Sequence, residues 1–385
     1  MVSSQAVLEN RYTERFREFN KTRSDRLRNF REEAFAYFAK NGFPTPRNEN
    51  WKYTNVAPIG EIDWKIAAAA LPTLDDGEGA AREILQKFSF SRDGFAALNA
   101  AFASPVLYRI ARDTRLDAPI EITVSAIPES VIFPHVIVIA EPGSKATLIE
   151  IYQGQGRSFT DAAVQIVVED NASLTHYRVQ KESPEAFHVG TTEISLGRGS
   201  YYNSTNINLG GAIARHDIDL KFNSEGGEAY VDGLYMLNGS QHSDTHSSID
   251  HLVPNCSSRQ NYKGVLNDRS RAVFNGKVFV RENAHGTDAQ QSNKNLLLSN
   301  DARVDTKPQL EIFNDDVKCS HGATVGQLDE EELFYLLTRG LPEPLARNLL
   351  TYGFAEEIIN KIEIESIKTE LDTAVLNRLQ ANLEG

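Results

Sequence analysis

The sequence predicts a mainly β protein, a parallel β-helix with helical segments on either side, and two observations lead to this prediction. From about residue 105, short β-branched runs alternate with turn residues, and long helical patterns disappear. The turns at Gly143-Ser144, Asn171-Ala172, Gly199-Ser200 and Gly227-Glu228 follow one another at a constant interval. A period of about 28 residues is typical of a solenoid, in which each coil buries its apolar face by stacking on the next. The alternative is a β-sandwich, whose turns come about every 8 to 12 residues without a longer repeat.

Residues 1–104 are predicted to form a mostly helical domain. Apolar residues recur there at helical spacing, with charged residues between them, until a glycine and two prolines end the pattern. The apolar residues are Phe16, Phe19, Leu27, Phe30, Ala34, Phe35 and Phe38, and the pattern ends at Gly42, Pro44 and Pro46. A second, short helix is predicted over residues 83–88.

Residues 105–318 are predicted to form the parallel β-helix. Its clearest strands are the β-branched runs 136–139 and 164–168 and the alternating segment 218–222. The register of the repeat drifts after residue 255, so we do not expect a strict repeat over the whole core.

Residues 319–385 are predicted to form a C-terminal helical domain. Asp329 followed by Glu332 resembles a capping box, so a helix is expected over 333–338, with Gly340 ending it. A second helix is expected to end at Gly353, and a third is expected over 356–383.

Net charge and cysteine content indicate which partners and which cellular location to expect. The chain has 385 residues, with 53 Asp and Glu against 40 Lys and Arg, and a net charge of −13. Such a surface repels phosphate, so we expect neither nucleic acid nor a membrane surface as a partner. With two cysteines, no predicted signal peptide and no apolar run long enough to cross a bilayer, the expected location is the cytoplasm.

The motifs of several enzyme classes are absent from the sequence. There is no G-x-x-x-x-G-K-[ST] loop for ATP phosphates, no G-x-S-x-G elbow and no C-x-x-C pair. Gly154-Gln155-Gly156 is followed by Phe159 rather than by a third glycine, so the dinucleotide fingerprint is incomplete. We therefore expect neither an ATP-binding phosphate loop nor a dinucleotide-binding site of the usual kind, and neither a zinc ribbon nor a thioredoxin-type centre.

Two clusters of chemically active side chains remain, and the first is rich in histidine. If it forms a strand, alternation separates His251 from four residues on the other face, His242, Asp244, His246 and Asp250. Converging imidazoles and carboxylates would suit a metal ion, and the chain would then be a stand-alone metal-binding module. The alternative, favoured because no third histidine converges, is a polar solenoid face or subunit interface with hydrogen-bonded histidines.

The second cluster, residues 315–322, contains Cys319 and His321. A thiol two residues from an imidazole and next to Lys318 suggests a thiolate that ligates iron or receives sulfur. The alternative, which is favoured when this segment is considered alone, is a small buried cysteine and a structural histidine at a domain junction. Because iron–sulfur clusters usually have about four ligands, a cluster at this place must take ligands from another chain.

Longer segments around this cluster form a specific pattern. They are Gln291-Ser292-Asn293-Lys294-Asn295-Leu296-Leu297-Leu298-Ser299, Lys307-Pro308-Gln309-Leu310-Glu311-Ile312 and Asp315 through Gly326, with Leu333-Phe334-Tyr335, Arg339-Gly340 and the stretch from Pro44 through Trp51-Lys52-Tyr53-Thr54. Together they resemble the SufB/SufD family of iron–sulfur cluster assembly scaffold proteins over nearly the whole chain. SufB-like chains carry Glu-His-Glu where this sequence has Cys319-Ser320-His321-Gly322, which favours the SufD branch.

The resemblance implies a right-handed β-helix, a heterodimer with SufB through the core, and docking of the SufC ATPase on the C-terminal helices. It also implies a non-catalytic scaffold with a transient iron–sulfur cluster at the interface. His321 is the favoured contribution of this chain to that cluster, Cys319 is a less certain one, and Cys256 is not favoured. Whether a flavin binds the complex is left open.

A competing hypothesis from another class is a β-solenoid enzyme that acts on an acidic polysaccharide. Such an enzyme usually works outside the cell and needs a basic groove, whereas this chain is acidic and no export signal is predicted. The sequence therefore favours the scaffold.

Overall fold

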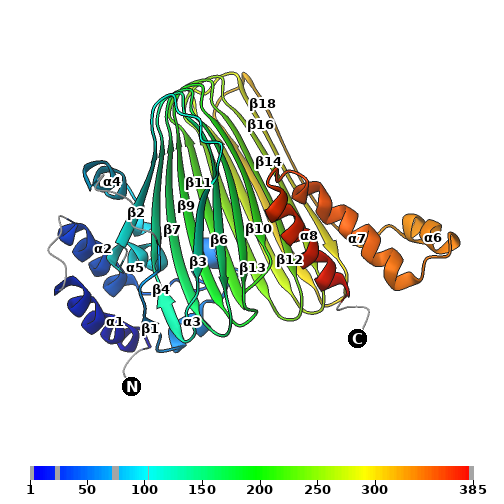
Figure 1. The fold of residues 1–385 in the computed structure, drawn as a ribbon, viewed down its shortest axis with the longest axis horizontal. Helices are drawn as coiled ribbons and strands as arrows, with labels where there is room; N and C mark the ends of the chain where they lie inside the picture. The colour runs from blue at the N-terminus through cyan, green and yellow to red at the C-terminus, as the bar shows by residue number, and fades with distance from the viewer. Residues whose placement is uncertain (1–3, 22–26, 72–77, 103, 381–385) are drawn as a thin grey trace.

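The computed structural model describes residues 4–21, 27–71, 78–102 and 104–380, and its centre is a parallel β-helix (Figure 1). Two sheets face each other, and their strand pairs are parallel. The predicted fold class is confirmed, and the β-sandwich is wrong because its strands would pair antiparallel.

The first sheet has ten strands in the order β1-β4-β7-β9-β11-β13-β15-β17, with β5 pairing β2 and β7. Its strands are β1 (Lys65–Ile66), β2 (Ser104–Ile110), β4 (Ser130–Ile132), β5 (Pro134–Ala140), β7 (Phe159–Val168), β9 (Phe187–Leu196), β11 (Ile213–Phe222), β13 (His242–His251), β15 (Arg271–Val280) and β17 (Arg303–Ile312).

The second sheet has eight strands in the order β18-β16-β14-β12-β10-β8-β6-β3. They are β3 (Ile120–Ser125), β6 (Lys145–Gly154), β8 (Ser173–Glu182), β10 (Tyr201–Asn208), β12 (Glu228–Leu237), β14 (Ser257–Leu266), β16 (Thr287–Leu297) and β18 (Val317–Gly326).

The period of the turns in the sequence is the length of one coil. Strands β6 and β8 begin at Lys145 and Ser173, the same interval as the turns, whereas β16 and β18 begin slightly farther apart, which is the drift expected after residue 255. Three of the predicted turns contain a residue with positive φ, Gly143 (70°), Asn171 (56°) and Gly199 (57°), and at the fourth the residue with positive φ is Gly226 (75°), one position before the predicted Gly227. Glycine and asparagine adopt this left-handed conformation at low cost, so the turn residues set the repeat.

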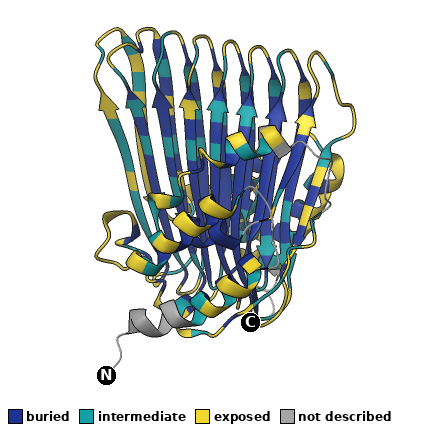
Figure 2. Cartoon of the chain, turned by 90° about the vertical axis from the view of Figure 1, so that its left-hand side faces the viewer, coloured by how far each residue is buried: buried dark blue, intermediate teal, exposed yellow. Residues whose placement is uncertain are grey.

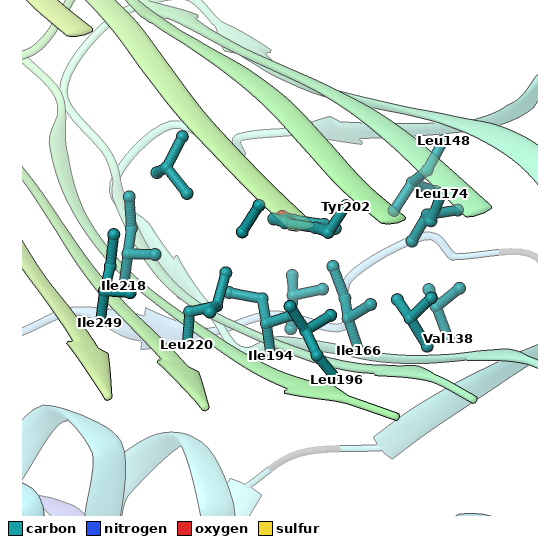
Figure 3. Close-up of a cluster of buried hydrophobic side chains, with 14 of the residues drawn as sticks. Val138, Leu148, Ile166, Leu174, Ile194, Leu196, Tyr202, Ile218, Leu220 and Ile249 are labelled. Carbon is teal, nitrogen blue, oxygen red and sulfur yellow. The ribbon is translucent and has the colours of Figure 1, made fainter. Parts of the chain in front are cut away.

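The interior of the β-helix is filled by the inward-facing side chains of both sheets. Figure 3 shows ten of them in two facing layers, Val138, Leu148, Ile166, Leu174, Ile194, Leu196, Tyr202, Ile218, Leu220 and Ile249. The strands are largely buried, whereas the turns between coils and the outer faces of the helices are exposed (Figure 2). Stacking of coils therefore supplies the core that no single coil has.

Helices cover the outer face of the first sheet. They are α1 (Ser4–Lys21), α2 (Arg28–Asn41), α3 (Ala57–Glu61), α4 (Glu78–Leu85) and α5 (Gly94–Phe102), with single 3₁₀ turns at η1 (Glu49–Trp51) and η2 (Phe90–Arg92). Predicted core residues such as Phe16, Phe35 and Phe38 belong to one cluster with Phe102 of α5, which stacks on Phe133 in the link between β4 and β5. As predicted, α2 ends at Gly42, whose φ is 63°. The short helix predicted over 83–88 begins earlier, at Glu78.

Three helices follow the last strand: α6 (Glu330–Thr338), α7 (Glu343–Ile359) and α8 (Glu365–Gln380). Asp329 caps α6 as predicted, because its carboxylate accepts hydrogen bonds from the backbone N–H groups of Glu331 and Glu332. The second half of α7 and α8 cover the outer face of the second sheet, on the side of the β-helix opposite the N-terminal helices (Figure 1).

The helix expected to end at Gly353 continues to Ile359, so that prediction is wrong. A glycine inside a helix costs only about 1 kcal/mol relative to alanine. Burial of Ala355, Ile358 and Ile359 against the sheet offsets this cost. The predicted helix over 356–383 is interrupted between Ile359 and Glu365, and residues 381–383 lie outside the described residues.

His251 makes the stability of the fold dependent on pH. Its ring is fully buried, stacks on Phe222 and shares a hydrogen bond of 2.9 Å between Nε2 and Ser258 Oγ. Burial lowers the pKa of His251 to about 4. An unfolded histidine has a pKa near 6.5, so the unfolded chain binds more protons as the pH falls from 6.5 toward 4, and stability is lost in that window.

We expect His251→Gln to reduce the loss of unfolding free energy between pH 7 and pH 5 by about 2 kcal/mol. Urea unfolding at the two pH values measures this, and the exposed His285 provides the control His285→Gln. Equal pH dependence in wild type and His251→Gln would contradict the assignment.

Candidate functional site

The two ends of the β-helix differ. At the N-terminal end, Ala67, Ala69 and Leu71 pack against the interior cluster and cover it. At the C-terminal end, β17 and β18 are the last strands of their sheets, and no element of the described chain pairs with their outer edges. The C-terminal end therefore presents two open strand edges, which favour pairing with another chain.

Apolar residues of the last coil are incompletely covered. Leu310 and Val317 pack on the interior cluster and remain partly exposed, and Phe313 and Val325 expose 55% and 48% of their surface. Pro308 has no N–H group, and proline is tolerated in an edge strand such as β17. We call this surface, formed by β17, β18 and Phe313, the open end.

The sequence-predicted site residues lie on the open end. Cys319 and His321 belong to β18, which continues to Gly326, so the boundary expected after Lys318 falls inside the last strand. Both residues have the same parity as Val317, which faces the interior, and they pair with Ala289 and Gln291 of β16. The strand places their Cα atoms about 7 Å apart on one face.

The environment of Cys319 in this chain does not favour its thiolate form. Cys319 is partly buried against the interior cluster, and burial raises its pKa. Lys318 was expected to favour the thiolate, but alternation along β18 turns its side chain to the opposite face. Activation of Cys319 therefore depends on whatever covers the open end.

Cys256 lies away from the open end. It precedes β14, two strands before β18, and only 1% of its surface is exposed. Its Sγ lies 3.4 Å from the Pro254 carbonyl oxygen, and burial raises its pKa. Both properties are those of a structural cysteine.

The histidine-rich cluster forms β13 and has the predicted alternation. His242 Nε2 lies 2.8 Å from Thr54 Oγ1, and His246 Nε2 lies 3.0 Å from Asp244 Oδ1. Asp244 also accepts hydrogen bonds from Thr54 Oγ1 and Arg215 Nη1, which hold its pKa well below the usual range despite its burial. His242 is therefore hydrogen-bonded, as the structural interpretation expected, His246 lies at ion-pair distance from Asp244, and the Asp244 carboxylate is already paired with Arg215.

Arg215 joins the N-terminal domain to the β-helix, a role that the sequence analysis did not find. Its guanidinium makes two 2.8 Å hydrogen bonds to Asp217, donates to the Asn50 carbonyl oxygen and stacks 3.8 Å from the Trp51 ring centroid. Nothing in the local sequence marks a contact between segments so far apart in the chain. A cleft of about 1080 Å³ lies beside this contact.

The open end supplies two donors suited to iron, the Cys319 thiol and the His321 imidazole. Within the described ranges, no three His, Cys, Asp or Glu side chains are grouped so that they could hold a metal ion. Gln291, the residue that pairs with His321, has a buried acceptor, Oε1, that receives no hydrogen bond from any described residue. Gln291 Oε1 suits a histidine ligand at His321, because a histidine that binds a metal ion usually donates its second ring N–H group to an acceptor. The remaining ligands of the metal must come from outside the chain.

The geometry defines a class of protein: a β-solenoid, covered by helices on both outer faces, with a cysteine and a histidine on the last strand of its open end. Two protein-family models match this chain. Residues 122–354 match the core domain of SufBD proteins of the SUF system for FeS cluster assembly, and residues 2–82 match the N-terminal region of SufBD proteins.

Curated relatives carry the same description. The iron–sulfur cluster assembly protein SufD of Escherichia coli is 34% identical over 384 residues, covering 88% of this chain and 90% of the relative. A SufBD family protein of Synechocystis is 35% identical, covering 87% and 76%, and SufD of Bacillus subtilis is 29% identical, covering 78% and 72%. The chain belongs to the SufB/SufD family of iron–sulfur cluster assembly proteins.

The family places the chain in iron–sulfur cluster assembly and implies a complex with partner proteins. Among the helices of the described residues, none is long and apolar enough to cross a membrane.

Proposed function

We propose that this chain is a scaffold subunit on which an iron–sulfur cluster forms at an interface with a homologous SufB-type chain, driven by ATP hydrolysis in a SufC-type partner. The observation that carries the proposal is the position of Cys319 and His321, on one face of the last strand at an open end. The cluster is cargo that passes on to other proteins, so the chain itself needs no catalytic group.

Two candidate ligands on the last strand of this chain suit an iron–sulfur cluster that is shared with a second chain. An iron–sulfur cluster usually takes about four protein ligands, and β18 offers at most two. A homologous chain with its own last strand at the interface would bring further thiolates or imidazoles to the same place. Covering the open end would also bury Phe313 and Val325, whose exposure costs free energy in the isolated chain.

The C-terminal helices supply a surface for the ATPase. In α6 no residue is buried, and the helix projects away from the β-helix (Figure 1). Together with the first half of α7 it exposes apolar side chains, namely Phe334, Tyr335, Leu337, Leu345 and Leu349. An apolar helix face of this kind fits a groove on a partner protein, and a moving ATPase could transmit force through α7 to the second sheet.

The proposal is tested by complex formation and cluster content. Wild-type protein co-expressed with SufB-type and SufC-type partners is expected to purify as one complex that accumulates iron and sulfide under anaerobic conditions. Val325→Lys places a charge on the open edge of β18 and is expected to weaken association with the SufB-type chain, because an edge lysine opposes strand pairing.

Leu116→Lys is the matched control. Leu116 is similarly exposed, at 38%, and lies at the opposite end of the β-helix, pairing its backbone with Lys145. Analytical ultracentrifugation at micromolar concentration measures both variants. A Val325→Lys chain that forms the heterodimer as well as Leu116→Lys does would exclude the open end as the interface.

A further inference from the structure

A ladder of polar side chains runs inside the β-helix toward His321. Paired positions of parallel strands stack on one another, and one inward row of the second sheet contains Gln260 of β14, Gln291 of β16 and His321 of β18. Gln260 and Gln291 expose only 3% and 4% of their surfaces. His321 is exposed because, among the described residues, no strand pairs with the outer edge of β18.

The hydrogen bonds of this ladder have a direction. Gln260 Nε2 donates to Ser247 Oγ over 2.8 Å, and Gln291 Nε2 donates to Gln260 Oε1 over 2.6 Å. Gly276 leaves room for the amide of Gln291, since a Cβ atom at that position would lie 2.2 Å from Gln291 Nε2. With Gln260 oriented in this way, turning over the Gln291 amide alone would place two amide oxygens against each other, so Gln291 Nε2 faces Gln260 and Gln291 Oε1 is left as the free end of the row.

The free end of the ladder is an acceptor. Gln291 Oε1 is buried and receives no hydrogen bond within the described part of the chain. A buried acceptor without a donor is unfavourable, and the next residue in the row is His321, whose ring carries an N–H group. A strand spacing of about 4.8 Å brings the two side chains within reach of each other after a rotamer change.

We infer that Gln291 is a positioning residue, which accepts a hydrogen bond from one ring nitrogen of His321 and so fixes the histidine tautomer. The other ring nitrogen then keeps its lone pair and points away from the ladder, toward the open end. A histidine that binds a metal ion usually donates its second N–H group to such an acceptor. This inference rests on the proposed role of His321 as a cluster ligand.

Asp315 and Asp316, which are close in sequence, cannot take this role in the strand. Asp316 precedes His321 by five residues, and at about 3.3 Å per residue the strand separates them by roughly 16 Å. Both aspartates are exposed. The acceptor is therefore a residue distant in sequence and adjacent in space.

The ring tautomer of His321 tests the inference in the full chain. Long-range ¹⁵N–¹H NMR of histidine-labelled protein reports the tautomer, and His321→Asn identifies the signal among the nine histidines. We expect one dominant tautomer in wild type and in Gln291→Glu, whose buried carboxyl group stays neutral, so that its O–H donates to Gln260 Oε1 and its other oxygen remains an acceptor. We expect a mixture of tautomers in Gln291→Leu, which has no acceptor. Gln290→Leu is the matched control, because Gln290 is an exposed residue on the opposite face of the same strand. If Gln291→Leu does not fold, Gln291→Met replaces it.

Cluster content of the purified complex gives the second measurement. Loss of an acceptor behind a ligand typically weakens metal binding by about 10- to 100-fold, so Gln291→Leu should retain at most about a tenth of the iron and sulfide, and Gln291→Glu should retain most of it. A wild-type tautomer in Gln291→Leu overturns the inference, as does full cluster content in Gln291→Leu where His321→Ala has lost it. If His321→Ala itself retains the cluster, the proposed function fails, and the tautomer alone still decides whether Gln291 positions His321.

Discussion

Replacing His321 by alanine is expected to lower the iron and sulfide recovered with the purified complex at least about tenfold, because the loss of a ligand should cost no less than the loss of its supporting acceptor. The complex itself should assemble normally. His321 is exposed in the isolated chain and its removal opens no cavity in the core, so the folding free energy should change little. Anaerobic iron and acid-labile sulfide assays on complexes of equal subunit composition measure the effect.

The two cysteines provide graded comparisons. Cys319→Ser should act in the same direction with a smaller effect or none, because burial disfavours its thiolate and a partner can supply thiolates. Cys256→Ser should leave the iron and sulfide content of the complex nearly unchanged, since Cys256 is buried next to β14, two strands away from β18. Wild-type cluster content in an intact His321→Ala complex would make His321 a structural residue and the site assignment wrong.

Charged substitutions on α6 and α7 should weaken docking of the ATPase strongly. Phe334 and Leu345 expose 68% and 48% of their surfaces and belong to a group of exposed apolar side chains on these helices. A group of this kind is typical of a protein–protein interaction site. If they form the centre of the docking surface, Phe334→Asp and Leu345→Asp should each cost about 2 kcal/mol or more, which weakens binding about thirtyfold. Titration of the purified ATPase subunit by calorimetry measures the loss.

The control for this experiment is Leu376→Asp. Leu376 of α8 is exposed to a similar extent, at 43%, but lies outside α6 and the first half of α7. Unchanged affinity in both Phe334→Asp and Leu345→Asp would place the docking surface elsewhere.

Deletion of residues 329–385 is a poor substitute for these point variants. From the sequence, the core is expected to survive this deletion. In the structure, Ile358 and Ile359 of α7 and Leu371 and Val375 of α8 are buried against outward residues of the second sheet, such as Leu234. Removing the helices would expose that apolar surface, so loss of ATPase binding could not be separated from damage to the β-helix.

The repeat could be predicted because it is a local property. A residue such as Gly143, Asn171 or Gly199 adopts positive φ at low cost. The positions of the turns and their regular spacing can therefore be recognised from the residue types alone. Period-two alternation is local as well, and it separated His251 from His242 and His246 correctly. The cap at Asp329 and the end of α2 at Gly42 follow from the same short-range chemistry.

Predictions that depended on packing were less successful. Gly353 was expected to end a helix, but a weak local preference yields to the burial of Ile358 and Ile359 on a sheet formed by a much earlier part of the chain. Lys318 was expected to favour the Cys319 thiolate, but strand geometry puts the two side chains on opposite faces. Adjacency in sequence is a poor guide to adjacency in space within a strand.

The sequence by itself determined the solenoid, its flanking helices and the candidate pair Cys319 and His321, because turn conformation, alternation and residue chemistry are local. Only the tertiary structure decided that this pair lies on the last strand of an open end, that Asp244 is already paired with Arg215, and that Gln291, the register partner of His321, holds a buried acceptor without a donor among the described residues. Each of these facts joins residues from different coils, or from a coil and the N-terminal domain. Such contacts arise from stacking whole coils, whose register depends on the sum of many side-chain contacts rather than on any one segment.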